Sequence, residues 1–557
     1  MTDDDWLATA ASQAHRHLSD RLRKRFTTKG WNEFDQRLDR HFERMFRLLH
    51  QLYGWHYDFA WTVESMVEVA AAGYLERPKR LRRADRAMLG EAPAWITQKE
   101  TTWATASPDA FFSHREGQIE SLALLGVSHL HVPTAWPTKA LRKELEAISQ
   151  TLAKAGIGLV LDFGTNHTPS DHPWARAAAQ GGPEADFYFF YPDRSMPDRL
   201  VVTLQNHVPE RGGDSFTWHP DVLGGRWVWT TFNDDEWDLN YSNPRVLAAV
   251  GAELLSLANL GAEVIRLDYT PFLWKRLGTN CEGLTEAHLI VQILRVLADI
   301  AAPGTVFLLG TGVKESQAPE HLDPSECRLG YGTLLTSSLW EALASNDTRL
   351  LRVALGRQNN TRDGCALLNS LRDPHDIGWV FTDTDALSLG IDPGLHRQYL
   401  ESFYGSLRTV ESMSGLESAL EEMDAGEVDL AIRRILAAWA VLVAASGIPL
   451  LSMGDEFASS SELSAQSRIL AGTRRLLEVR REMTGLDAMT PVETIDPGNR
   501  AVVAFRRGPS MLAANLTAQS ALIVRDAFPV GEYLDLIAEE VWDGLMMGPF
   551  EYRFVRL

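Results

Sequence analysis

Apolar side chains recur at helical spacing through the first 95 residues of the chain, with charged residues between them. Intervals of three and four residues place such positions on one face of an α-helix. The pattern therefore predicts an N-terminal helical region that buries one face. The positions that define it are Phe34, Leu38, Phe42, Met45, Phe46, Leu49 and Leu52.

The spacing changes near residue 110, where short apolar runs begin to alternate with amphipathic stretches. "IGLVLDFG" and "GAEVIRLDY" are typical of buried strands, and "TKALRKELEAISQTLAKAG" is typical of a helix. Strands and helices that alternate over several hundred residues indicate parallel βα units. We predict an α/β fold built on a TIM (β/α)8 barrel, whose chemistry lies at the carboxyl ends of the strands.

Two segments interrupt this alternation: residues 168–245, rich in proline, glycine and aromatic residues, and the shorter segment 379–430. After about residue 488 the chain turns to β-like alternation and ends in "FEYRFVRL". We therefore expect a helical domain over 1–98, a barrel with both insertions over 99–487, and a small β domain over 488–557.

Charge and composition exclude several classes of protein. The 557 residues carry a formal net charge of −20, which argues against non-specific binding of nucleic acid or of an anionic membrane. No apolar run reaches the roughly 18 residues that a membrane-spanning helix needs. The acidic start, Met-Thr-Asp-Asp-Asp-Trp, does not resemble a signal peptide, so we expect a cytoplasmic protein.

Three cysteines, Cys281, Cys327 and Cys365, are too few and too scattered for a disulfide framework or a zinc site. We expect neither a metal nor a cofactor. One stretch of the chain is locally basic, and we interpret it as a solvated helix face, with anion binding as the alternative. It contains Arg77, Lys79, Arg80, Arg82, Arg83 and Arg86.

The first motif with candidate chemistry is "LVLDFGTNHTPSDH". Asp162, Asn166 and His167 follow a predicted buried strand, so they are placed to line the barrel mouth and to hydrogen-bond sugar hydroxyls. Taken alone, the motif is more typical of a turn with an Asx cap.

The second motif is "GAEVIRLDYTPFLWK", in which Arg266 and Asp268 lie two residues apart. On a strand this spacing points both side chains to the same side. An arginine beside a carboxylate favours its ionised form, which a glycosidic nucleophile requires. A structural salt bridge at the strand end is the alternative interpretation.

The order D-x-x-x-N-H and then R-x-D resembles glycoside hydrolase family 13, the α-amylase family. "YPDRSMPD", "FLWKRLGTNCEG", "RDPHDIGWVFTDTDA" and "SGIPLLSMGDE" are similar to its amylosucrase branch, over nearly the whole chain. The resemblance implies inserted domains B (168–245) and B′ (379–430) and a C-terminal β-sandwich. It also implies cleavage of sucrose through a glucosyl-enzyme and transfer of glucose to a glucan.

Carried over to this chain, the resemblance places Asp268 on the nucleophile and Arg266 on its partner. Asp162, Asn166 and His167 become substrate-binding residues. The acid/base glutamate does not carry over, because its position falls on Thr311, or on Gly310 if the alignment shifts by one residue. Neither residue delivers a proton at neutral pH. The nearest carboxylate, Glu315, lies four residues beyond Thr311.

The third catalytic carboxylate belongs to a family pattern R-S-H-D-D-I-G-W, which reads "RDPHDIGW" here. Arg372 keeps its place as a substrate-binding residue. Without a gap, the transition-state aspartate becomes His375, and with a compensating insertion and deletion His375 and Asp376 form the pair. The family's sugar-holding loops after strand two and after "GDE" are shortened or absent.

These observations leave three functions open. The first is an amylosucrase-like protein that is catalytically impaired, a pseudoenzyme. The second is an active α-glucoside hydrolase or glucosyltransferase that keeps Asp268 and recruits a substitute proton donor from Glu315, His375 or Asp376. The third is a carbohydrate-binding or protein-interaction scaffold, including a homo-oligomer formed through the N-terminal helices. Sucrose or an α-glucan is the expected partner in the first two.

Overall fold

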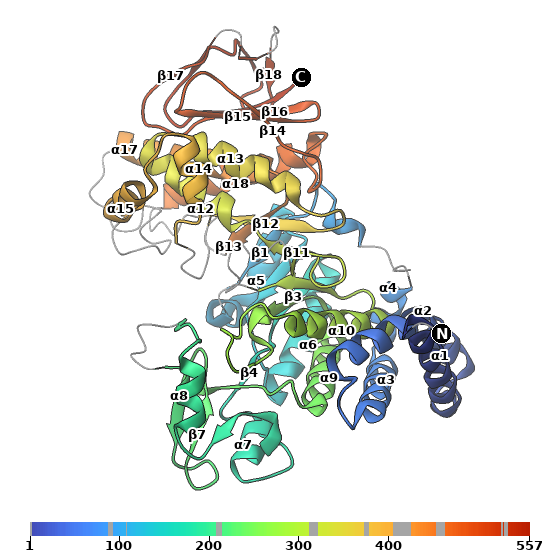
Figure 1. Ribbon diagram of the computed structural model, residues 1–557. Helices are drawn as coiled ribbons and strands as arrows, with labels where there is room; N and C mark the ends of the chain where they lie inside the picture. Colours follow the sequence, from blue (N-terminus) through green and yellow to red (C-terminus); the bar gives the residue numbers. More distant parts are fainter. Residues whose placement is uncertain are drawn as a thin grey trace. The chain divides into compact units, whose positions relative to one another are not determined.

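A computed structural model describes residues 3–86, 93–106, 108–207, 214–310, 321–371, 378–404, 425–452, 463–524, 527–528 and 533–557 (Figure 1). The chain divides into two compact units that interleave in sequence. The first unit comprises Met1–Pro93, Thr134–Thr151 and Leu159–Arg328, and the second comprises Ala94–Pro133, Leu152–Gly158 and Leu329–Leu557.

The central sheet is a closed barrel with the strand order β1, β13, β12, β11, β10, β9, β3, β2. Neighbouring strands pair in parallel, for example β3 with β9 and β9 with β10. This topology confirms the predicted TIM barrel. The strands are β1 (Trp103–Thr105), β2 (His129–Val132), β3 (Gly158–Gly164), β9 (Ala262–Asp268), β10 (Val306–Leu309), β11 (Leu329–Tyr331), β12 (Ala366–Ser370) and β13 (Ile448–Ser452).

Amphipathic helices lie between the strands, as the alternating pattern predicted. They are α5 (Pro108–Leu125), α6 (Lys139–Lys154), α9 (Pro244–Leu260), α10 (Thr285–Ala301), α12 (Thr333–Ser345), α13 (Arg349–Arg357), α14 (Asp383–Ser388), α15 (Pro393–Tyr404), α17 (Ala425–Ala444) and α18 (Leu463–Glu482). None of the helices in the described part of the chain is long and apolar enough to cross a bilayer.

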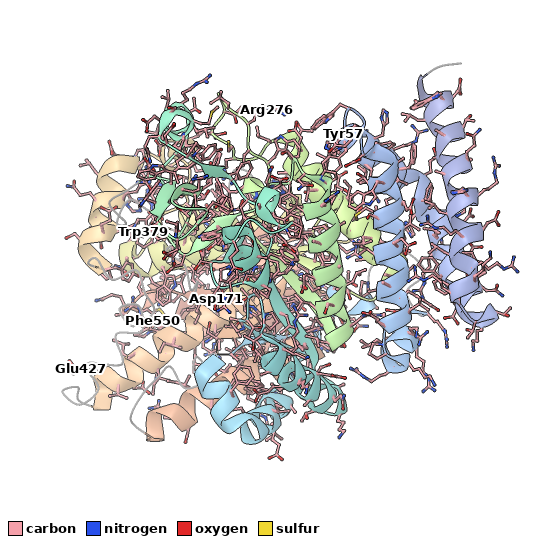
Figure 2. All side chains as sticks on the ribbon, turned by 90° about the horizontal axis from the view of Figure 1, so that it is seen from below. Tyr57, Asp171, Arg276, Trp379, Glu427 and Phe550 are labelled. Carbon is pink, nitrogen blue, oxygen red and sulfur yellow. The ribbon has the colours of Figure 1, made fainter. Side chains whose placement is uncertain are left out.

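The N-terminal region is helical, as its periodicity predicted. Its helices are α1 (Asp3–Leu22), α2 (Thr28–Tyr53), α3 (Phe59–Glu76) and α4 (Lys79–Asp85). Helix α2 begins after Thr27, whose side chain caps the helix by accepting a hydrogen bond from the Gly30 amide. Its apolar stripe is buried and the helix packs against α10. The turn after α2 exposes Tyr57 to solvent (Figure 2).

The segment after β3 forms two small antiparallel sheets beside the first unit's barrel strands. In one, β4 (His167–Pro169) pairs with β8 (Glu236–Asp238). In the other, β7 (Arg226–Trp229) lies between β5 (Phe190–Tyr191) and β6 (Phe216–His219). Helices α7 (Pro173–Ala179) and α8 (Ser195–Val201) complete the segment. The β4–β8 pairing brings Asp238 next to His167.

The C-terminal region is an antiparallel β structure, as predicted. Its main sheet has the order β14, β15, β16, β21, β18, β19, and a second pair joins β17 to β20. A cluster around Trp542 and Phe528 forms its core. The strands are β14 (Glu493–Ile495), β15 (Val502–Arg507), β16 (Ser510–Asn515), β17 (Ala521–Leu522), β18 (Tyr533–Asp535), β19 (Glu540–Trp542), β20 (Met546–Met547) and β21 (Tyr552–Arg556).

Candidate active site

The first unit brings the two sequence motifs together at the carboxyl ends of β3 and β9. In the parallel register, Asp162 lies beside Arg266 and Gly164 lies beside Asp268. Residues two apart on a strand point to the same side, so the three charged side chains share one side of the sheet. The structure therefore places these predicted residues in one cluster.

Arg266 bridges the two carboxylates. Its Nη1 atom donates to Asp162 Oδ1 at 3.2 Å and its Nη2 atom donates to Asp268 Oδ1 at 2.7 Å. The exposed fractions of these side chains are only 8% for Arg266 and Asp162 and 13% for Asp268. One guanidinium thus serves two buried carboxylates, and the cluster carries more negative than positive charge when both are ionised.

Burial raises the pKa of Asp268 to about 7, because the ionised form loses its hydration. Arg266 opposes this rise in pKa, whereas the negative charge of Asp162 adds to it. Arg266 thus favours the ionised form of Asp268, as its position suggested, but burial acts more strongly in the opposite direction. Desolvation outweighs the ion pair, so the protonated form of Asp268 is favoured more than in a free aspartate.

Strand β10 approaches Asp268 from the other side and presents a glycine there. The Gly310 amide donates to the carbonyl of Leu267 at 2.9 Å. A Cβ atom on Gly310 would lie 2.3 Å from Asp268 Oδ1, 2.6 Å from the Leu267 carbonyl oxygen and 2.8 Å from the Asp268 Cα. Two of these atoms belong to the backbone, so a side chain at position 310 requires β9 and β10 to separate.

The backbone after Asp268 is held in an uncommon conformation. Tyr269 has a φ of 60°, in the left-handed region that a non-glycine residue seldom occupies. The hydroxyl of Thr165 donates to the carbonyl of Asp268 at 2.5 Å, and the Tyr241 hydroxyl donates to the carbonyl of Thr165 at 2.6 Å. These buried hydrogen bonds fix the peptide that follows Asp268 and compensate for the strain.

Asn166 has a different setting from the one predicted. Its side chain is fully buried and donates to Asp238 Oδ2 at 2.9 Å, while its Oδ1 atom accepts from Lys275 at 3.1 Å. Asp238 also accepts from the Lys275 ammonium at 2.6 Å and from the Thr231 hydroxyl at 2.6 Å. Asn166 therefore holds a buried ion pair in place, whereas the motif suggested contact with a sugar.

His167 lies between this network and an aromatic group. Its Nε2 atom is 3.5 Å from Glu236 Oε2, and burial lowers its pKa, so the neutral ring is favoured at pH 7. Its ring centroid is 5.1 Å from that of Tyr269, which in turn lies 4.1 Å from that of Phe232. The Nδ1 atom of His167 is buried and has no hydrogen-bond partner among the described residues. That atom remains able to bond a ligand.

Trp136 is a residue that the motif search missed. It lies in the short connection after β2, where the resemblance indicated a shortened sugar-holding loop. Its indole Nε1 donates to the carbonyl of His167 at 3.0 Å, and a Cβ atom on Gly164 would lie 2.8 Å from that nitrogen. Trp136 therefore covers the end of β3. The signal in sequence was a bulky aromatic residue in an otherwise small loop.

Several predicted site residues lie outside the described residues. They are Thr311, Glu315, Arg372, His375 and Asp376. Their roles stay predictions.

A second polar cluster, which the sequence did not indicate, joins α10 to the segment before β11. Both His288 Nδ1 and His321 Nδ1 lie 3.1 Å from oxygens of Glu326, and Gln292 donates to the same carboxylate at 2.9 Å. These atoms are close enough to hold a metal ion. However, the two imidazole rings are stacked, with centroids 4.1 Å apart and planes at 15°. One ion cannot lie in both ring planes, so this arrangement is a hydrogen-bonded clamp.

Comparison with known proteins agrees with the fold and the motifs. Residues 135–292 match the family model of the alpha amylase catalytic domain. The chain is 30% identical to the glucosylglycerate phosphorylase of Allomeiothermus silvanus, over 55% of this chain and 56% of that protein. It is 24% identical to the trehalose synthase of Pimelobacter sp., over 67% of this chain and 68% of that protein. The alignment with the first of these relatives spans little more than half its length. The part of the chain from residue 135 to residue 292 is thus similar to the α-amylase family.

Solved structures share the same architecture. Trehalulose synthase MutB from Pseudomonas mesoacidophila MX-45 superposes with a TM-score of 0.61 at 14% identity, over 84% of this chain and 99% of that chain. The α-glucosyl transfer enzyme XgtA superposes with a TM-score of 0.60 at 16% identity, over 83% and 99%. At this identity the likeness shows the fold alone.

Proposed function

We propose that this chain keeps the nucleophile side of an amylosucrase-like site and lacks its proton donor, so that it does not turn over sucrose. The observation that supports this proposal is the close approach of Gly310 to Asp268. A retaining glycosidase needs two carboxyl groups about 5–5.5 Å apart, one as nucleophile and one as acid/base. Here the neighbouring strand contributes no side chain at that place.

The register of the strands supports the assignment of the acid/base position to Gly310 rather than Thr311. Leu308 pairs with Arg266 and Leu309 with Leu267, so residue 310 comes opposite Asp268. Neighbours in a parallel pair point to the same side of the sheet. The group that would face Asp268 from β10 therefore belongs to residue 310, which is the alignment shifted by one.

The chemical consequence follows from the leaving group. A sugar alkoxide departs poorly and needs a proton as the glycosidic bond breaks. General acid catalysis of this kind contributes roughly 10²–10⁴ in rate. Neither the hydrogen atom of a glycine nor a threonine hydroxyl supplies that proton. The raised pKa of Asp268 weakens the site further, because only the ionised carboxylate attacks an anomeric carbon.

The same argument applies to phosphorolysis. A relative of this chain is a glucosylglycerate phosphorylase by name, and a glycerate leaving group also departs as an alkoxide. We therefore propose that glucosylglycerate with phosphate is not turned over either.

The alternative is an active enzyme whose proton comes from Glu315, His375 or Asp376, and a binding scaffold for carbohydrate or protein is the further alternative. The free, buried cysteines fit a reducing compartment, and we place the protein in the cytoplasm.

The test compares ordinary and activated substrates with the purified full chain. Sucrose, and glucosylglycerate with phosphate, should give no release of fructose, glycerate or glucose. The fluoride ion of α-glucosyl fluoride leaves without protonation, so this substrate should react, although slowly at most. Asp268→Asn should abolish that reaction. Asp198→Asn, at an exposed ion pair with Arg194, is the matched control and should leave it unchanged.

Sucrose turnover at an ordinary enzyme rate that Asp268→Asn abolishes would overturn the proposal, because it would require another proton donor. In that case Glu315→Gln, His375→Gln and Asp376→Asn, tested one at a time, would identify the donor.

A further inference from the structure

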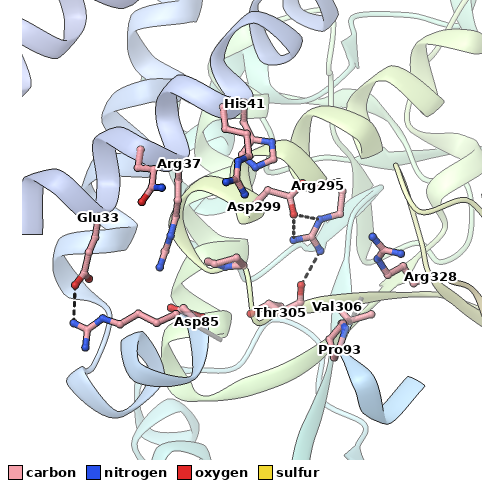
Figure 3. Close-up of a pocket in the computed structure, with 14 residues that line it drawn as sticks. Glu33, Arg37, His41, Asp85, Pro93, Arg295, Asp299, Thr305, Val306 and Arg328 are labelled. Carbon is pink, nitrogen blue, oxygen red and sulfur yellow. Dashed lines mark hydrogen bonds and ion pairs between the residues drawn. The ribbon is translucent and has the colours of Figure 1, made fainter. Parts of the chain in front are cut away.

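A cavity lined by basic side chains lies in the first unit, at the amino end of β10 (Figure 3). It is bounded by α2, the end of α4, the end of α10 and the first residue of β10, Val306. Its volume of about 110 Å³ exceeds several-fold what a single water molecule needs. Asp268 faces the opposite end of β10, at Gly310. The strand is four residues long, so about 13 Å of backbone separates the cavity from the candidate active site.

Positive charge dominates the described lining of this cavity. Five arginines and one histidine face three carboxylates, and the basic members are Arg37, Arg40, His41, Arg86, Arg295 and Arg328. The whole chain carries a net charge of −20, so the positive charge of this lining is opposite to the net charge of the protein. A local reversal of this kind in a concave site favours an anionic ligand.

Each of the three carboxylates already has a cationic partner. Asp85 accepts from Arg77 Nε at 2.5 Å and from Arg77 Nη2 at 2.8 Å, and Arg77 is not part of the lining. Asp299 pairs with Arg295 at 2.9 Å. Glu33 pairs with Arg86 at 2.8 Å and accepts from the Tyr74 hydroxyl at 3.0 Å. Asp85 and Glu33 act on Arg37 only through their charge, and each already holds another arginine.

Arg37 is the residue that points to a ligand. It comes from α2, and Figure 3 shows it across the cavity from Arg328. Its Nη1 atom is buried and has no hydrogen-bond partner in the described part of the chain. Burial lowers its pKa, and the charge of Asp85 only partly offsets this effect. A buried donor atom without a hydrogen-bond partner costs free energy, and a bound anion removes that cost.

A second basic pocket adjoins the first and shares Glu33 and Arg86 with it. Its lining adds Lys29, Lys79, Arg82 and Arg83. The two groups both approach the ring of Tyr74, since the guanidinium carbons of Arg37 and Arg82 are 5.8 Å and 5.4 Å from its centroid. Two linked basic sites suit a ligand with two anionic groups. Part of the basic stretch predicted as a solvated helix face, residues 79–86, lines this pocket.

We propose that the cavity at Arg37 binds a phosphate group of a small phosphorylated molecule, with a second phosphate held by Arg82 and Arg83 in the adjoining pocket. Phosphate fits because the planar guanidinium group donates two parallel hydrogen bonds to its oxygens. The volume of about 110 Å³ at Arg37 suits a small group rather than a nucleic acid or an acidic protein segment. This site is separate from the proposed catalytic function and does not depend on it.

Isothermal titration of the full chain with inorganic phosphate and with pyrophosphate tests the proposal. Pyrophosphate should bind at least about tenfold more tightly than phosphate, because it reaches both pockets. Arg37→Gln should weaken both ligands at least about tenfold, which corresponds to the 1.4 kcal/mol or more that a charged hydrogen bond contributes. Arg83→Gln, at an exposed position, should remove only the preference for pyrophosphate. Arg474→Gln, at an exposed ion pair elsewhere, should change nothing.

Two further measurements separate this site from others. Asp268→Asn should leave phosphate binding unchanged. Loss of phosphate binding in this variant would place phosphate at the candidate active site and overturn the proposal. In phosphate-free buffer, Arg37→Gln should raise the melting temperature, since it removes a half-buried charge whose Nη1 atom has no hydrogen-bond partner among the described residues. Added phosphate should stabilise the wild type but not this variant. Three outcomes would each overturn the proposal. The wild type binds neither phosphate nor pyrophosphate, or binding is insensitive to Arg37→Gln, or RNA or an acidic peptide binds more tightly than pyrophosphate.

Discussion

Gly310 stands opposite Asp268 so closely that a Cβ atom at position 310 would lie 2.3 Å from the carboxylate oxygen Oδ1 of Asp268. The two residues end neighbouring parallel strands, and the amide of Gly310 is bonded to the carbonyl of Leu267. Strands β9 and β10 therefore lie so close together here that no room is left for the side chain of a proton donor at position 310. The loss of a side chain and the close approach of the backbone form one structural feature.

The first prediction concerns the packing at this position. Gly310→Ala should lower the free energy of unfolding by about 1–3 kcal/mol, because the new methyl group meets backbone atoms that cannot move independently. Gly356→Ala is the matched control, since Gly356 lies in α13 with open space where its Cβ would be. That substitution should stabilise the protein by about 0.5–1 kcal/mol. Urea denaturation of both variants measures the difference, and a Gly310→Ala variant as stable as the wild type would show that the strands separate freely.

The second prediction concerns restoration of the missing acid. Neither Gly310→Glu nor Thr311→Glu alone should produce measurable sucrose turnover. At position 310 the side chain has no room beside the backbone of Leu267 and Asp268. Trp136 also covers the end of β3, where a sugar-holding loop was expected. Release of fructose from sucrose by either variant, detected by a coupled assay, would contradict this prediction.

The third prediction follows from the raised pKa of Asp268. Its pKa in the folded protein is about 7, above the ordinary 3.8, so the folded state holds a proton that the unfolded state releases between these two values. The stability that this proton contributes is complete below about pH 4 and is lost as the pH rises through 7. Asp268→Asn does not titrate, so its stability relative to the wild type should rise from pH 4 to pH 8.

The size of that change is on the order of a few kcal/mol, since each pKa unit corresponds to about 1.4 kcal/mol. Melting temperatures of both proteins across this pH range measure it. A constant difference between them would show that Asp268 is ionised throughout, as the ion pair with Arg266 alone would suggest. The slow reaction with α-glucosyl fluoride should likewise increase as the pH passes 7, because the carboxylate is the nucleophile.

The fourth prediction concerns the buried ion pair that supports the site. Asp238→Asn should destabilise the protein by about 3–5 kcal/mol, because it leaves the buried Lys275 ammonium without a compensating charge. Asp198→Asn removes a carboxylate from an exposed pair with Arg194 and should cost less than about 1 kcal/mol. Equal stability of the two variants in urea denaturation would show that Lys275 is hydrated in the folded protein.

Local patterns were sufficient for the architecture. The change from a helical to an alternating pattern near residue 110 predicted the barrel, because strand and helix periodicities depend only on which face each residue buries. The R-x-D spacing predicted that Arg266 and Asp268 share one side of a strand, and the structure has this arrangement. The same kind of reasoning was insufficient for Asn166, whose side chain is bonded to Asp238 from a segment far along the chain.

The sequence by itself determined the fold class and the position of Asp268 at a strand end, since both depend on residues close together in the chain. Only the tertiary structure decided how that carboxylate behaves and what surrounds it. Its pKa depends on desolvation by strands distant in sequence, and the place beside it is closed by the approach of β10. The partnerless Nη1 atom of Arg37 likewise becomes visible only when α2, α4 and α10 enclose it, because burial and charge pairing belong to three-dimensional packing.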